Sequence, residues 1–222
     1  TYNTDFAETE VDNRRVNLTR FPIMYPEKRD FFLEGSQNFA FATGPLAFHS
    51  RRIGLTSDGQ RMNIVGGAKI TGRQGRLGIG MLGMHLNNFG TLDSEEVFVG
   101  RFTYDIFEES KVGAIFTHGD PQANLDNRMT GFDINLRKTE WLEGRSITAH
   151  GFYMTSEDQV RGNGEVYGGR IAFPNYPFYA TLRWKRIGED FEPAMGFVAR
   201  RGVDNYGAFA QYAFDVPKSF LF

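Results

Sequence analysis

Acidic residues near the N-terminus are the first candidates for chemistry in this chain. In an extended segment, Glu8, Glu10 and Asp12 lie two residues apart and therefore share one face. Hard cations such as Ca²⁺ bind clustered carboxylates, and paired carboxylates could also catalyse glycoside hydrolysis. The competing interpretation is a salt-bridge network with nearby arginines. Because the sequence sets no two carboxyl groups at a working distance, we expect no enzyme activity, no cofactor and no metal, and keep these three residues only as calcium candidates.

Other classes of catalytic and binding protein lack their characteristic residues here. The chain has no cysteine, which excludes disulfides, thiol catalysis and Cys-based metal sites. Its four histidines are far apart and show no metal-ligand spacing. No phosphate loop, nucleophile elbow or zinc-protease motif occurs. The net charge of −2 gives no sign of nucleic-acid binding. We therefore predict no catalytic residues.

Residues 1–35 predict a charged, irregular leader that acts as a plug or as a periplasmic segment. Pro22 and Pro26 argue against a central strand or a long helix. The apolar run 31–33 is expected to anchor the leader, while Lys28, Arg29 and Glu34 pair with lumen charges. The leader charge network is predicted to contain Glu27, Lys28, Arg29, Glu34, Arg51 and Arg52.

The remaining residues, 36–222, are predicted to form the strands of a β-barrel. A first strand is expected over Asn38–Ala42. From about Met62 to Phe214, segments alternate apolar and polar residues, and short turns alternate with longer loops. This pattern predicts an all-β, antiparallel, up-and-down barrel of about 10–12 strands. Its last hairpin is expected to pair residues 193–200 with residues 205–214.

Alternation alone leaves open which face of the strands points outward. Two aromatic belts near the strand ends, as at membrane interfaces, favour an apolar face towards lipid. The belt near the short turns contains Phe107, Trp141, Phe173, Tyr176 and Phe178, and the belt near the longer loops contains Phe89, Phe98, Tyr153, Trp184 and Phe191. The transmembrane interpretation predicts a lumen lined by Lys69, Arg73, Arg101, Asp105, Asp133, Arg137, Arg170, Arg183 and Lys185.

Three sequence motifs resemble a known family. The segment Val16–Gly35, which contains P-E-K-R-D-F-F-L-E-G, resembles the signature of a bacterial family of unknown function, as do Ser50–Gly54 (S-R-R-I-G) and Gly66–Gly72 (G-G-A-K-I-T-G). Asp30 stands where that family usually has proline. In the family, a domain like a family-nine carbohydrate-binding module precedes a region taken to be an outer-membrane β-barrel. The resemblance implies that this chain is like the start of that region, and that it is a piece of a larger barrel or a shortened member.

Pattern and resemblance together predict a porin-like protein of the outer membrane of a Gram-negative bacterium. Its expected role is structural, channel-forming or transport-related, with a link to saccharide or polymer handling at the cell surface. The expected partners are membrane lipid and other outer-membrane or periplasmic proteins, and not nucleic acid. A soluble β-barrel that binds an apolar ligand is the alternative, and it would bury Phe102, Ile134 and Leu182. A surface glycoside-active enzyme is the second alternative.

Overall fold

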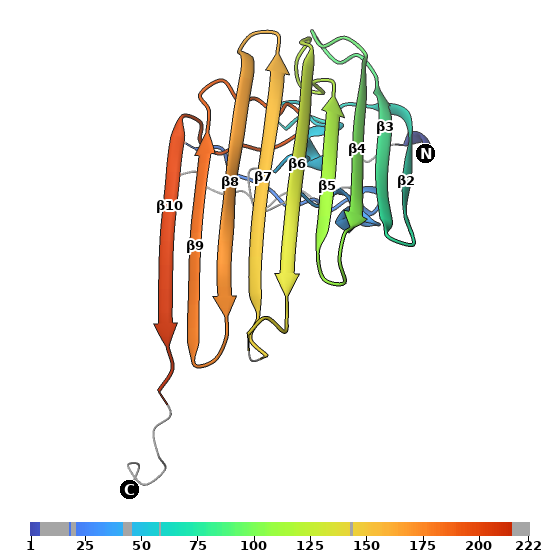
Figure 1. Cartoon of the computed structure of the whole chain (residues 1–222). Helices are drawn as coiled ribbons and strands as arrows, with labels where there is room; N and C mark the ends of the chain where they lie inside the picture. Colours follow the sequence, from blue (N-terminus) through green and yellow to red (C-terminus); the bar gives the residue numbers. More distant parts are fainter. Residues whose placement is uncertain (5–17, 19–20, 42–45, 58, 143, 215–222) are drawn as a thin grey trace, which may run out of the picture.

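The computed structural model describes residues 1–4, 18, 21–41, 46–57, 59–142 and 144–214. They form one antiparallel sheet in which a three-residue strand precedes nine long ones, each beside its neighbours in sequence (Figure 1). The strands are β1 (Tyr2–Thr4), β2 (Ile64–Gln74), β3 (Leu77–Leu86), β4 (Glu95–Asp105), β5 (Lys111–His118), β6 (Asn127–Lys138), β7 (Ile147–Asp158), β8 (Gly162–Pro174), β9 (Phe178–Ile187) and β10 (Val203–Tyr212). The predicted all-β, up-and-down order is confirmed.

The sheet is open in the part of the chain that the structure describes. β1 pairs with β2, and β10 pairs with β9, but β1 and β10 do not pair with each other. The short turns form as the sequence predicts: β2 ends at Gln74, and Gly75 takes a positive φ of 57° in the turn to β3. Closure into a barrel therefore stays a prediction.

The hydrophobic core lies on one side of this sheet, which we call the inner face. Leu82, Val99, Ile115, Met129 and Met154 are buried there. They are covered by residues 21–41 and 46–57, which we call the covering segment, and by residues 188–202, the β9–β10 loop. Figure 1 shows the covering segment, in blue to cyan, and the orange loop on the same side of the sheet.

The covering segment contains three short helices: α1 (Asp30–Leu33), η1 (Ser36–Phe39) and η2 (Ser50–Arg52). The strand predicted over Asn38–Ala42 is therefore wrong at its start, where η1 lies, and Ala42 is outside the described residues. Gly35 takes a left-handed conformation that ends α1 and turns the chain, and its carbonyl accepts hydrogen bonds from both nitrogens of Asn38. Phe39 then packs into the core.

The strand predicted over residues 193–200 is also wrong. β10 pairs directly with β9, and the β9–β10 loop folds back onto the inner face. Phe191 and Met195 are fully buried, and Ala194, directly before Met195, is buried as well, so burial does not alternate with the two-residue period of a strand. Leu46 pairs with Phe197, and the His49 amide donates to the Met195 carbonyl at 2.8 Å. These long-range contacts hold the loop against the covering segment.

Candidate lipid-facing surface and charged inner face

The opposite side of the sheet, which we call the outer face, is apolar and uncovered among the described residues. Phe102, Ala114, Phe132, Tyr153 and Tyr167 are successive cross-strand neighbours from β4 to β8 and form one row across it. Large exposed side chains of this face include Ile70, Phe98, Phe102, Tyr104, Phe116, Phe132, Ile134, Leu136, Tyr153, Ile171, Phe178, Leu182, Trp184 and Tyr206. A contiguous apolar surface of this kind marks an interaction site.

Aromatic pairs lie at both ends of the outer face. Near the short turns, Phe173 lies 6.5 Å from Trp141 and 6.1 Å from Phe178, measured between ring centres. Towards the longer loops, Phe98 lies 6.4 Å from Phe116. One residue predicted for the second belt is misplaced: Phe191 lies in the core, because the loop that carries it folds inward.

A hollow of about 760 Å³ lies within the outer face. Small residues, among them Ala114 and Gly151, line it together with larger aromatic side chains, including Phe132, Tyr153 and Trp184. The side chain of Trp184 lies over Gly169, where an added Cβ atom would stand 2.6 Å from the indole ring. Small residues beside large aromatic side chains thus make this face uneven.

All nine residues predicted to line a lumen lie on the inner face. Their cross-strand neighbours place them there: Arg101 pairs in register with Ile115, Asp133 with Phe152, and Arg170 with Arg183. The same parity holds for Lys69, Arg73, Asp105, Arg137 and Lys185. Because the described sheet is open, lining a lumen stays a prediction for these residues.

The most deeply buried of these charges form an ion pair. Arg101 Nη1 donates to Asp133 Oδ1 at 2.6 Å, and both side chains are no more than 2% exposed. Arg101 Nε also donates to the Ala40 carbonyl at 3.1 Å, and its guanidinium lies 5.1 Å from the centre of the Phe41 ring. The guanidinium occupies the space above Gly113, where a side chain would collide with it. The pair therefore fastens the covering segment to the middle of the sheet.

Three further predicted lumen residues, Lys69, Arg73 and Asp105, have other partners. Lys69 Nζ donates to the carbonyls of Phe31 and Glu34, the latter at 2.6 Å, and lies 4.8 Å from the centre of the Phe31 ring. Arg73 pairs with Asp105 near the short-turn end of the sheet. Lys69 thus stabilises the end of α1 through backbone carbonyls, whereas the sequence predicted that charged side chains of the leader would pair with the lumen.

Within the leader, Glu27 is the centre of the charge network. Its carboxylate accepts hydrogen bonds from the Arg29 side chain at 2.8 and 2.9 Å and from the Ser50 hydroxyl at 2.6 Å. Burial alone would raise the pKa of Glu27, but these bonds and the charge of Arg29 lower it from 4.5 to about 2. Arg29 also donates to the carbonyls of Ser50 and Ile53, so the network joins α1 to η2.

The other predicted members of the network have separate contacts. Arg51 Nη1 donates to the Pro26 carbonyl at 3.3 Å, and the backbone amide of Lys28 donates to Glu27. Arg52 instead contacts the loops, through the Gly196 carbonyl at 3.1 Å and through Gln122. The calcium candidates Glu8, Glu10 and Asp12 lie outside the described residues, and no group of three acidic or histidine side chains that could hold a metal occurs among the described ones.

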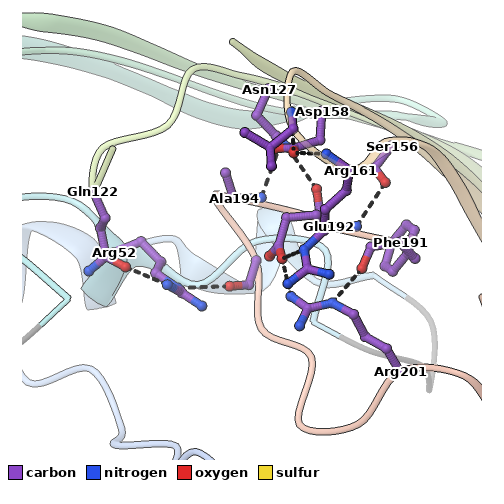
Figure 2. Close-up of polar contacts among 12 residues, drawn as sticks. Arg52, Gln122, Asn127, Ser156, Asp158, Arg161, Phe191, Glu192, Ala194 and Arg201 are labelled. Atoms are coloured by element: carbon purple, nitrogen blue, oxygen red, sulfur yellow. Dashed lines mark hydrogen bonds and ion pairs between the residues drawn. The ribbon is translucent and has the colours of Figure 1, made fainter. Parts of the chain in front are cut away.

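A cluster at the long-loop end of the sheet was not predicted from the sequence. Figure 2 shows Asn127, at the start of β6, between Asp158 and the β9–β10 loop. Its side-chain amide donates to Asp158 at 3.0 Å and to the Glu192 carbonyl at 2.8 Å, and it accepts from the Ala194 amide at 3.1 Å. Asn127 is 1% exposed, so these bonds satisfy a buried polar group.

Charged and hydroxyl side chains complete this cluster. The Ser156 hydroxyl accepts from the Glu192 amide at 2.9 Å, and the Glu192 carboxylate binds Arg161 and Arg201 (Figure 2). Arg201 Nε also donates to the Phe191 carbonyl at 2.8 Å. The cluster therefore fixes the folded-back loop. Asn127 and Ser156 resembled ordinary strand-end residues in the sequence because their partners are 31 to 67 positions away.

Comparison with known families reaches only the first part of the chain. A family model described as Domain of unknown function (DUF5916) matches residues 1–85. The matched part includes the covering segment, β1, β2 and most of β3, and all three motifs on which the predicted resemblance depends. No curated protein and no solved structure matches the chain. The match supports a family of unknown function, and the carbohydrate-binding module and the outer-membrane barrel stay predictions.

Among the described residues, no helix has the length and apolar character needed to cross a bilayer.

Proposed function

We propose that this chain forms wall strands of a bacterial outer-membrane β-barrel with a structural, channel or transport-related role. Its outer face contacts lipid, and its inner face, together with the covering segment and the β9–β10 loop, forms a partly plugged interior. Lipid is its first partner, and other outer-membrane or periplasmic proteins are the remaining expected ones. A link to saccharide or polymer handling rests on the predicted family resemblance alone.

The observation that carries this proposal is the contrast between the two faces of the sheet. The buried ion pair Arg101–Asp133 lies on the covered inner face, whereas Phe102 and Leu182 on the uncovered outer face are 41% and 57% exposed. A sheet built for water would bury the second set and expose the first. The distribution is the one that a barrel wall in lipid requires.

The number of apolar side chains on the outer face indicates how much lipid contact would stabilise the protein. Burial of a Leu, Ile or Phe side chain stabilises a protein by about 1.5–3 kcal/mol. The large side chains of this face are partly exposed, so transfer of a dozen of them into lipid would contribute on the order of 10 kcal/mol. Strands of about nine to eleven residues cross a bilayer when tilted, and β2 to β10 have 8 to 13 residues.

The alternatives gain less support from the same observations. A soluble barrel with an apolar interior would bury Phe102, Ile134 and Leu182, which are 41%, 36% and 57% exposed. A glycoside-active enzyme needs two carboxyl groups at a working distance. Asp133, the most buried acid on the inner face, is instead held by Arg101.

Arginine substitution on the outer face and in an exposed loop tests the proposal. In lipid vesicles, Leu182→Arg should reduce the free energy of unfolding by about 2–4 kcal/mol, as for a cation at the bilayer midplane. Asn88→Arg, at an exposed position in the loop between β3 and β4, should change it by less than about 0.5 kcal/mol. Equal small effects of the two substitutions would contradict a lipid-facing position for Leu182, because a cation is well tolerated at a half-exposed site in water.

A further inference from the structure

A hollow on the inner face of β8, β9 and β10 gathers positive charge. Arg170, Arg183 and Lys185 line this hollow of about 720 Å³, and no carboxylate belongs to its lining. Register places Arg170 directly opposite Arg183, with Lys185 two residues farther along the same face of β9. Among the described residues, none of the three forms an ion pair, whereas Arg73 and Arg101 on the same face each pair with an aspartate.

Neighbouring side chains hold these cations in place without neutralising them. Arg170 Nε donates to the Thr181 hydroxyl and Nη2 to the Tyr179 hydroxyl, each at 3.1 Å, which orients the guanidinium. Arg183 lies over Gly207, where an added Cβ atom would stand 2.6 Å from its Nε atom. Glycine on the neighbouring strand therefore leaves room for the Arg183 side chain to lie across the floor of the hollow.

Three neighbouring cations with no acidic partner among the described residues repel one another, and the fold does not require them at these positions. Like charges directly opposite each other on neighbouring strands destabilise a sheet. Arg170 and Arg183 nevertheless occupy one such pair of positions, with a third cation beside them. An oxyanion in the hollow would remove this repulsion, because guanidinium groups bind carboxylate and phosphate through paired N–H donors. The amides of Asn205 and Gln211, which also line the hollow, supply further donors.

We propose that this hollow, which we call the basic hollow, binds an oxyanion-bearing solute, with a carboxylate or a phosphate held by Arg170, Arg183 and Lys185. The inference extends the proposed function and rests on it for access to the hollow from a water-filled interior. Rings of arginine and lysine select anions in pores. The basic hollow would therefore make this side of the interior selective for anionic solutes.

Titration of the full-length protein in detergent tests the binding directly. Inorganic phosphate and citrate serve as the two oxyanion probes, and sucrose as a neutral probe of similar size. The double variant Arg183→Gln/Lys185→Gln removes two of the three positive charges and should weaken oxyanion binding about tenfold. A cleft lined by charges of one sign raises the local concentration of an oppositely charged ligand by about tenfold or more. Arg186→Gln is the matched control, because Arg186 is on the same strand but is in register with Tyr167 of the outer face.

Each outcome of this titration either supports or overturns oxyanion binding in the basic hollow. Binding of phosphate alone or of citrate alone supports the proposal and identifies the anion class, and binding of both supports it for oxyanions in general. Failure of both to bind, equal binding of sucrose, or equal weakening by Arg186→Gln would overturn it. The arginine substitutions at Leu182 and Asn88 test the proposed function separately, because they measure stability in lipid and not ligand binding.

Discussion

Removal of the negative partner of Arg101 should be among the most destabilising single changes in the sheet. In Asp133→Asn the Arg101 guanidinium stays buried, at 1% exposure, without a compensating charge. Two charges about 4 Å apart interact by about 4 kcal/mol at an effective dielectric constant of 20. Loss of one partner from a buried pair typically costs 3–5 kcal/mol, so we expect a loss of about 4 kcal/mol in the free energy of unfolding.

The assay is denaturant unfolding in lipid vesicles, followed by the fluorescence of the two tryptophans. Asp204→Asn is the matched control, because it breaks an Arg–Asp pair whose side chains are 61% and 50% exposed and whose contribution should be below about 1 kcal/mol. If Asp133→Asn fails to fold, the double variant Arg101→Met/Asp133→Leu should restore folding, since no unpaired charge is left. Equal costs for Asp133→Asn and Asp204→Asn would refute the reasoning.

Three further predictions concern the segments that cover the inner face. Gly164→Ala should displace the β9–β10 loop and expose it to protease, because the added Cβ atom would stand 2.2 Å from the Phe191 amide nitrogen. Gly72→Ala is the control: a Cβ atom there would have no atom from the rest of the described chain within 4 Å, so digestion should be unchanged. Asn127→Ala should reduce the free energy of unfolding in a denaturant titration by about 1–3 kcal/mol, because its buried partners lose their hydrogen bonds. The lowered pKa of Glu27, about 2 against 4.5, means that its contribution to docking of the covering segment is complete above pH 4.5 and is lost as the pH falls towards 2. Proteolysis of that segment should therefore accelerate below pH 4.5, and Glu27→Gln should flatten this dependence; an unchanged pH profile in that variant would contradict the assignment.

The strands were predictable because their signal is local. Two-residue alternation located the sheet, and β5 has the predicted bounds, Lys111–His118. The same alternation separated the charged residues from the aromatic ones, since each cross-strand pair keeps its side chains on one face. Sequence reasoning therefore placed Arg101 and Asp133 on a face opposite Phe102.

The covering layer was less predictable because long-range contacts determine it. Residues 38–39 and 193–200 have the apolar content of strands, yet Phe39, Phe191 and Met195 pack individually into the core. The partners of Asn127 are 31 and 65 to 67 residues away, and no local pattern relates them. Pro193 and Gly196 were the available sequence signals that this segment is not a regular strand.

The most direct test of the account is the environment of the outer face in a bilayer. The chain has no cysteine, so single cysteines can carry spin labels without background labelling. We predict that labels at Phe102, Ile134 and Leu182 of the full-length protein in lipid vesicles are accessible to oxygen and protected from a water-soluble nickel chelate. Labels at Asn205 and Gln211 on the inner face should show the opposite accessibility. Nickel accessibility at the first three positions, with protection at the last two, would contradict the lipid-facing assignment.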